Sequence, residues 1–234
     1  MSDSSAPILE IRGLRHDYRQ PDGSNQQALK LDSLEARRGE RLVVSGPSGS
    51  GKTTLLHILA ALIRPTHGEV IFSGQNLNGL GASRSTWRAA SVGYIFQEMN
   101  LLPDFDILDN LLIAAEISNI SHNAAIERAK SLISDLVLTD RMRSRPRKLS
   151  LGEQQRAAVA RAVIHSPVLV LADEPTASLD ADNTHIVMKL LLRLCEESQS
   201  LLIVATHEET LKKLASRTVL LEKAKSSSSY GELS

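Results

Sequence analysis

Short runs of apolar residues, many of them β-branched, recur along the chain, and each has the length of a single buried strand. Between several of these runs, the apolar residues follow the spacing of a helix instead. Strands that alternate with helices are typical of an α/β fold with a wound parallel sheet. The predicted strands are Ile8–Ile11, Arg41–Ser45, Glu69–Phe72, Val92–Phe96, Val168–Ala172, Leu201–Ala205 and Val219–Leu221. The predicted helices are Lys52–Leu62, Ala124–Leu136, Glu153–Ile164, Asn183–Glu197 and Glu209–Ala215.

The stretch from Gln97 to about His165 departs from this alternation, because its pattern is mostly helical although predicted strands flank it on both sides. We therefore predict a helical subdomain, residues 98–165, inserted into the α/β core. The core and the insert together form one predicted domain, residues 1–222. Residues 223–234 contain a run of serines and few apolar side chains, so we expect a flexible tail there.

The composition agrees with a globular domain, since 42% of the 234 residues are hydrophobic and can fill a core. The 27 basic residues balance the 27 acidic ones, and a zero net charge lacks the long-range field typical of a nucleic-acid-binding protein. We therefore expect no nucleic-acid partner. Cys195 is the only cysteine, which predicts a small buried side chain and a reducing compartment.

The apolar pattern contains no segment suited to crossing a membrane. Residues Met1–Pro7 are small and polar and do not resemble a secretion signal. The longest apolar run, Leu55–Ile63, is interrupted by His57 and is far shorter than the roughly 18 residues of a spanning helix. We expect the chain to be cytoplasmic, so that any membrane involved must be crossed by another polypeptide.

A glycine-rich phosphate loop lies between the predicted strand at Arg41 and the predicted helix at Lys52. Its glycines let consecutive N–H groups point at phosphate oxygens, in front of the positive end of the helix. The lysine can reach the β and γ phosphates, and the Thr53 hydroxyl can bind Mg²⁺. A plain turn between strand and helix is the alternative, which the agreement of spacing, residue types and flanks disfavours. The predicted ATP-binding residues of this loop are Gly46, Ser48, Gly49, Ser50, Gly51, Lys52, Thr53 and Thr54.

Two adjacent carboxylates, Asp173 and Glu174, end the apolar strand Val168–Ala172. The carboxyl ends of parallel strands share one edge of a sheet, so this pair is expected beside the phosphate loop. We predict that Asp173 is a ligand of Mg²⁺ and that Glu174 polarises the water that attacks the γ phosphate. Acids that merely cap the strand and face solvent are the alternative, and the phosphate loop upstream favours catalysis.

The segment Leu149–Arg156 is similar to the signature motif of the ABC ATPases. The resemblance implies that Ser150, Gly152 and Glu153, at the start of a helix, contact the ATP of a second subunit. Leu151 stands where the family often has glycine.

Other positions resemble further motifs of the family, in the family's order. Gln97 resembles the glutamine that contacts Mg²⁺ or the attacking water, and His207 resembles the histidine that senses the γ phosphate. The segment from Ser178 to Asp180 is similar to the D-loop, and Tyr18 stands where the family stacks an aromatic ring on adenine. Taken singly, such a histidine or glutamine is more often a structural or surface residue, whereas for Tyr18 stacking on adenine is favoured over a core or surface role. The shared order favours the family assignment.

The resemblance implies an ABC fold with an additional antiparallel β region, ATP and Mg²⁺ as cofactors, and a homodimer or pseudo-dimer that closes head to tail around two ATP molecules. It also implies a separate integral membrane permease, with this chain peripheral on the inner face of the membrane. The permease is expected to dock around residues 97–110, where the apolar side chains are Leu101, Leu102, Phe105 and Ile107. The alternative is that these side chains simply pack the helical insert.

Several segments resemble the branch of the family that serves lipoprotein release and macrolide efflux. FtsE-type division ATPases are close relatives of that branch and remain an alternative, as does a soluble ABC ATPase. A module that binds ATP without turnover is disfavoured because Glu174 is present. The segments that carry the resemblance to the branch are Ala28-Leu29, Pro65–Gly68, Arg84–Arg88, Phe96-Gln97 and Asn100–Pro103.

Overall fold

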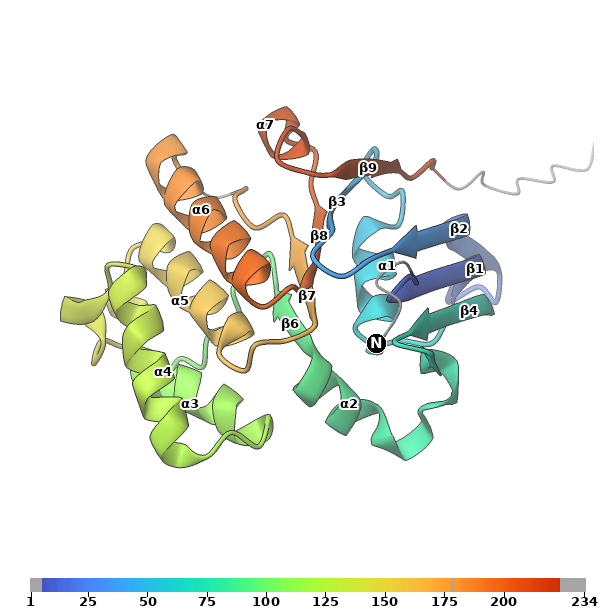
Figure 1. Ribbon diagram of the computed structural model, residues 1–234. Coiled ribbons are helices and arrows are strands. Elements are labelled where there is room, and N and C mark those ends of the chain that lie inside the picture. The colour runs from blue at the N-terminus through green and yellow to red at the C-terminus, as the bar shows by residue number, and fades with distance from the viewer. Residues whose placement is uncertain (1–5, 178, 224–234) are drawn as a thin grey trace, which may run out of the picture.

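The computed structural model describes residues 6–177 and 179–223, and within these the strands form two sheets (Figure 1). Ser178 and residues 224–234, most of the tail predicted from the sequence, lie outside the described residues. The larger sheet is parallel throughout and has the strand order β6-β7-β8-β3-β9. Its strands are β6 (Val92–Ile95), β7 (Leu169–Asp173), β8 (Leu201–Ala205), β3 (Arg41–Ser45) and β9 (Arg217–Leu220).

Strands β7 and β8 are buried on both faces, which explains why they are continuous apolar runs, whereas the edge strand β9 is mostly exposed. Successive side chains of a strand point to opposite faces, so Leu42 and Val44 belong to one hydrophobic core and Val43 belongs to the other. In strand β7, Leu169 and Leu171 belong to the same core as Leu42 and Val44, and Val170 belongs to the same core as Val43. The strand predictions were therefore most accurate in this sheet.

The second sheet is antiparallel, as the family resemblance implied, with the order β2-β1-β4-β5. Its strands are β1 (Leu9–Arg19), β2 (Asn25–Ala36), β4 (His67–Phe72) and β5 (Gln75–Asn76). The prediction for β1 was too short and β2 was missed, because polar residues dominate both: in β2 only Leu29, Leu34 and Ala36 are buried. Pairing with β1 holds β2 in place despite its weak pattern.

Helices cover both faces of the parallel sheet. Helix α1 (Lys52–Leu59) contacts β7 and β8 of the parallel sheet and β2 of the antiparallel sheet, and Figure 1 shows it between the two. The opposite face is covered by α5 (Leu151–Val163) and α6 (Ala181–Glu197), with α3 (Ile107–Ile117) and α4 (His122–Asp135) farther out. Two short helices complete the described chain, α2 (Arg84–Ser91) and α7 (Glu209–Lys212).

Between β6 and β7 the chain contains α3, α4, α5 and two single turns of 3-10 helix. Their buried side chains join one core with the adjacent face of the parallel sheet. Helix α3 had no predicted bounds, and α2 was not predicted, since none of its residues is buried and its pattern is mostly polar.

Within the described residues, no helix is both long and apolar enough to span a bilayer. Cys195 is buried, and burial raises the pKa of its thiol to about 12.

Candidate functional site

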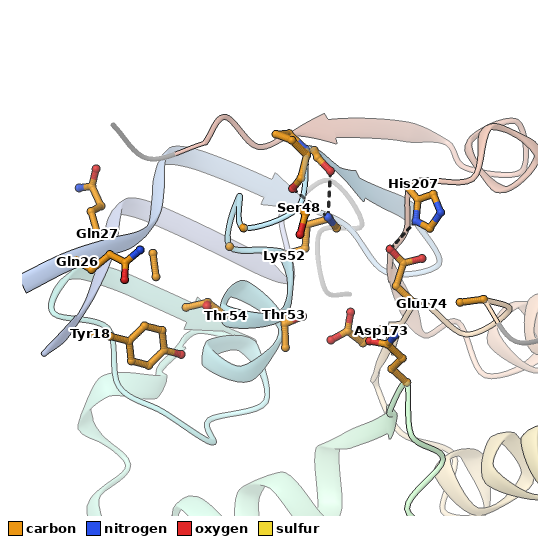
Figure 2. A pocket seen from close by; sticks show the side chains of 17 residues that line it. Tyr18, Gln26, Gln27, Ser48, Lys52, Thr53, Thr54, Asp173, Glu174 and His207 are labelled. Carbon is orange, nitrogen blue, oxygen red and sulfur yellow. Dashed lines mark hydrogen bonds and ion pairs between the residues drawn. The ribbon is translucent and has the colours of Figure 1, made fainter. Parts of the chain in front are cut away.

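A cleft of about 670 Å³ opens at the carboxyl ends of β3 and β7 and is closed on one side by the β1-β2 hairpin (Figure 2). It brings together residues that are far apart in the sequence, because parallel strands end at the same edge of their sheet. The predicted residues that line it are Tyr18, Gly46, Ser48, Gly49, Gly51, Lys52, Thr53, Thr54, Gln97, Asp173, Glu174 and His207.

The phosphate loop is held close to strand β2. Gly51 has a φ of 92°, a left-handed conformation, and a Cβ atom at this position would collide with the carbonyl oxygen of Ala28. The Lys52 Nζ donates hydrogen bonds to the carbonyl oxygens of Gly46, at 3.0 Å, and Pro47, at 3.3 Å (Figure 2). The ammonium group is therefore folded over the loop, at the amino end of α1 where an anion is favoured.

One residue of the loop turns its side chain away from the cleft. Ser50 was predicted to bind ATP, but its side chain does not line the cleft. It is 1% exposed and packs under the loop against Gly46, and its hydroxyl has no hydrogen-bond partner among the described residues. The glycine-rich motif gives the position of the loop in the sequence, but it does not show which of the side chains point into the cleft and which are buried beneath the loop.

Asp173 occupies the base of the cleft and is only 6% exposed. Burial raises the pKa of its carboxyl above the ordinary 3.8, and the neighbouring Glu174 charge adds to the rise, while the Thr53 hydroxyl opposes it. Asp173, Thr53 and Gln97 offer oxygen ligands to one cavity, which are the ligands that Mg²⁺ prefers.

The described residues contain no cluster of three or more His, Cys, Asp or Glu side chains suited to holding a metal by themselves. A cation at Asp173 would therefore need ligands from outside the protein as well, and this fits Mg²⁺, which is commonly bound by one or two carboxylates together with phosphate oxygens.

The variant Asp173→Asn is expected to be more stable than the unmodified chain without nucleotide, while losing Mg²⁺-dependent ATP hydrolysis. A raised carboxyl pKa means that the charged form is disfavoured in the folded state, so at neutral pH the carboxylate lowers fold stability. Removing this penalty should raise the unfolding midpoint, and in a chain of this size each 1 kcal/mol corresponds to about 2–4 °C. The difference in unfolding midpoint between the variant and the unmodified chain should disappear as the pH falls below 3.8, the ordinary pKa of an aspartate, because Asp173 is then as neutral as the asparagine. Thermal unfolding across this pH range measures it, and a lower midpoint at pH 7 would contradict the argument.

Glu174 is positioned by contacts on three sides. Its backbone φ is 45°, unusual for a residue with a side chain, and its N–H donates to the carbonyl oxygen of Ala205 at 2.8 Å. The carboxylate accepts a hydrogen bond from Thr206 at 3.1 Å on Oε2. Its Oε1 lies 2.9 Å from the His207 Nδ1, as Figure 2 shows by a dashed line. The side chain is 13% exposed, so it is shielded yet faces the cleft.

The His207 ring is 71% exposed, in contrast to its partner. Its hydrogen bond to Glu174, and then the charge of that carboxylate, raise the pKa of the imidazole. The attraction is therefore present at low pH and is lost as the pH rises through the raised pKa. Because solvent screens so exposed a pair, it adds little to fold stability, and the ring is free to leave Glu174.

Tyr18 lines the cleft on the side of the β1-β2 hairpin and is 43% exposed. The buried His16 packs against it in a T-shaped arrangement, with ring centroids 4.6 Å apart. Three residues of β2 also line the cleft and were not assigned to it from the sequence: Gln26, Gln27 and Ala28. The register that pairs Tyr18 with Gln26 brings them there, and only the hairpin pairing could have revealed it. Ala177, which follows β7, lines the cleft as well.

The predicted signature residues do not line the cleft. Ser150 caps α5: its hydroxyl accepts from the Glu153 N–H at 3.3 Å, and the Glu153 carboxylate accepts from the Ser150 N–H at 2.8 Å. These hydrogen bonds, with Arg141, lower the pKa of Glu153. The Glu153 side chain is thus used in shaping the helix start, where the sequence predicted a nucleotide contact. Leu151, beside Ser150, is 56% exposed.

Asp180 also lies outside the cleft lining. It caps α6 by accepting from the backbone and side-chain N–H groups of Asn183, both at 2.8 Å, which lower the pKa of its carboxyl. Asn183 in turn bonds Arg156 of α5, and a Cβ at Gly152 would collide with it. The signature helix and the D-loop residue therefore form one connected surface. Ser178, the first residue of the predicted D-loop, lies outside the described residues.

An α/β core with a phosphate loop, an acidic pair at the adjacent strand end and an antiparallel sheet over the cleft defines a P-loop ATPase of the cassette type. The family model for ABC transporters matches residues 29–177. The chain therefore belongs to the ABC transporter family, in which it is the ATP-binding, ATP-hydrolysing subunit, as the sequence predicted.

Curated relatives include the lipoprotein-releasing system ATP-binding protein LolD of Bacteroides thetaiotaomicron, 41% identical over 91% of this chain and 95% of that protein. LolD of Syntrophus aciditrophicus is 39% identical with the same coverage of each chain. The putative hemin import ATP-binding protein HrtA of Staphylococcus epidermidis is 39% identical over 85% of this chain and 89% of its own.

Solved structures of MJ0796, a bacterial ABC transporter cassette, share the fold. Its dimeric structure has a TM-score of 0.86 and 31% identity, and covers 92% of this chain and 95% of that one. The dimeric post-hydrolysis state of MJ0796, bound to ADP and phosphate, has a TM-score of 0.85 with the same identity and coverage. These similarities confirm the predicted fold class.

Proposed function

We propose that two copies of this chain close head to tail around two Mg²⁺·ATP molecules and that hydrolysis reopens them, driving a separate membrane permease. One observation supports this most directly: the phosphate loop lines the cleft, whereas the signature residues do not. Residues that act on one nucleotide but lie apart in one chain require a second chain to bring them together.

The start of α5 has the properties of a surface that closes on a partner. Leu151, 56% exposed, is next to the Ser150 hydroxyl on the first turn, and a helix start favours an anionic group. Contact with the nucleotide of a second chain would cover the leucine and supply the anion. A nucleotide bound in this way favours the closed pair, and loss of the γ phosphate removes that preference. The dimeric structures of MJ0796 support the arrangement.

The residues of the cleft have separate roles in this proposal. Lys52 and the loop N–H groups bind the β and γ phosphates, and Tyr18 stacks on the base. Mg²⁺, held by Thr53, Asp173 and Gln97, would neutralise charge on the phosphates. Glu174 accepts a proton from the attacking water once His207 has turned from its carboxylate toward the γ phosphate.

Residues 98–165 form the proposed helical subdomain, and a hollow on it is the proposed docking site for the permease. The hollow, of about 690 Å³, is lined by Phe105, by apolar side chains on and between α3 and α4, and by three polar side chains, Asp109, Glu116 and His122. Of the four apolar residues considered from the sequence, Phe105 is 45% and Leu102 38% exposed, whereas Ile107 is buried and Leu101 packs on the core. An exposed aromatic side chain beside an apolar hollow suits a helix of a partner subunit.

Replacing Phe105 with Glu is expected to reduce capture of the permease about 10-fold or more, because one buried aromatic anchor contributes about 2 kcal/mol to such interfaces. The tagged full chain is expressed in its source cell, solubilised in mild detergent and captured, and multi-spanning membrane proteins are quantified by mass spectrometry.

Ile117→Glu is the matched control, since Ile117 is exposed on α3 but does not line the hollow. Capture should remain within about twofold in that control, as should the ATPase rate of both isolated variants. Equal capture of both variants would contradict docking at Phe105, and capture of no multi-spanning protein by the unmodified chain would contradict a permease partner.

We further propose that the transporter belongs to the export or lipoprotein-release type, with this chain on the cytoplasmic face of the membrane. The similarity to the two LolD proteins, over 91% of the chain, supports this. HrtA is named for hemin import at a comparable identity. The captured membrane protein distinguishes these classes, and a cell-division protein in its place would favour the FtsE-type alternative.

A further inference from the structure

We infer that Thr206 is a positioning residue of the ATPase: its buried hydroxyl fixes the Oε2 atom of Glu174, so that the Oε1 atom is the one presented to the attacking water. This inference rests on the proposed role of Glu174 as the base. Thr206 does not line the cleft, and it acts only through the carboxylate.

Two hydrogen bonds determine where the Thr206 proton points. Its Oγ1 accepts the backbone N–H of Glu208 at 3.1 Å, and the same oxygen lies 3.1 Å from the Glu174 Oε2. A carboxylate oxygen can only accept, so the hydroxyl proton is directed at Glu174. The contact is a hydrogen bond to a charged acceptor, which is the stronger kind.

The threonine itself cannot easily move. It is 0% exposed, and its N–H donates to the carbonyl oxygen of Val44 at 3.1 Å, on the strand that leads into the phosphate loop. The Glu174 N–H is bonded to Ala205, the residue before the threonine. Base, threonine and phosphate loop are therefore fixed to one another through β3 and β8.

The two partners of the Glu174 carboxylate differ sharply in burial. Thr206, which contacts Oε2, is fully buried. His207, which contacts Oε1, is 71% exposed. When the histidine leaves, Oε1 becomes available, while Oε2 remains held. A base that keeps one hydrogen bond loses little orientation at that step, and orientation within about 0.5 Å matters for the rate.

A second buried threonine provides a matched control. Thr176 is 2% exposed on the neighbouring loop, and its hydroxyl donates to the Glu208 Oε1 at 2.8 Å. It resembles Thr206 in burial and in having a carboxylate acceptor, but its acceptor is not the base. A loss of activity that came only from weakened packing would appear equally in both.

The experiment compares Thr206→Val with Thr206→Ser and Thr176→Val in the full chain, with kcat and the KM for ATP measured for each. T206V is expected to lower kcat about 10-fold or more with KM changed less than about twofold, because the base is misplaced while ATP binding is intact. T206S restores kcat to within about threefold, and T176V stays within about threefold of the unmodified chain. Should T206V fail to fold, Thr206→Cys, with a weak S–H donor of similar size, takes its place with a smaller expected loss of about fivefold.

A double variant separates this inference from the proposed function. In the Glu174→Gln background, T206V should change the residual rate, followed with radiolabelled ATP, by less than about twofold, since interacting residues are not additive. If E174Q is inactive while T206V turns over normally, or if T176V loses as much as T206V, the inference is overturned and the base assignment stands. If E174Q itself hydrolyses normally, the proposed base is wrong, and the inference is overturned with it.

Discussion

The variant Glu174→Gln is expected to bind ATP as tightly as the unmodified chain and to hydrolyse it about 100- to 1000-fold more slowly. The amide keeps an oxygen that can accept from Thr206, so the geometry of the cleft survives, but it cannot take a proton from water. Loss of the negative charge also frees His207 from its ion pair. Binding and chemistry are thereby separated in one substitution.

Because the γ phosphate then persists, the closed pair of chains should accumulate. Size-exclusion chromatography with ATP and Mg²⁺ should show a dimer for E174Q that is absent with ADP. Glu209→Gln is the control: this exposed residue pairs with Lys212, outside the cleft, and its loss should change kcat by less than about twofold. Hydrolysis by E174Q at the ordinary rate would remove Glu174 from the role of base.

The parallel sheet and its attached helices followed from the sequence because their physical cause is local. Strands buried on both faces need apolar residues at every position, so runs such as Leu201–Ala205 can be recognised without their neighbours. Helix α6 was predicted within two residues of its start, since its apolar residues keep helical spacing and Asp180 caps it.

The antiparallel sheet could not be predicted in the same way. In β1, the residues beyond Ile11 are largely charged or polar, and only Leu14 and His16 among them are buried. Their extended conformation comes from pairing with β2 and β4, which are distant in sequence. The contributions of Gln26 and Gln27 to the cleft depend on that pairing, so no pattern along the chain could indicate them.

In the candidate site, too, some features could be predicted from the local sequence and others could not. Motif spacing located Lys52, Asp173 and Glu174 in one cleft because each follows a strand of the same sheet. Side-chain direction was not available from spacing, so the sequence could not show that the Ser50 side chain is buried under the loop. The capping role of Glu153 is a further case, since a glutamate at the third position of a helix serves equally as cap and as ligand.

Lys52→Ala is expected to weaken ATP binding about 100-fold, because it removes a charged donor worth about 1.5–3 kcal/mol to the phosphates. The short side chain also removes the donor to the Gly46 carbonyl oxygen, whereas the Pro47 carbonyl oxygen still accepts the Ser50 N–H at 3.2 Å. In the unmodified chain, ATP with Mg²⁺ raises the unfolding midpoint by mass action, and at the same concentration the variant should show almost no rise. Lys52→Arg keeps the charge but not the compact ammonium, so it should recover little.

The same variant tests the head-to-tail pairing when mixed with Ser150→Phe, which is expected to bind ATP normally but to block the surface that receives the partner's nucleotide. Each variant alone should be inactive, since every site in a pair of identical chains then lacks one half. In a mixed pair, one site combines the intact phosphate loop of the S150F chain with the intact Ser150 of the K52A chain, so activity should return. Unchanged ATP affinity in K52A would contradict the phosphate-loop assignment, and a mixture that stays inactive although it forms mixed pairs would contradict the shared site.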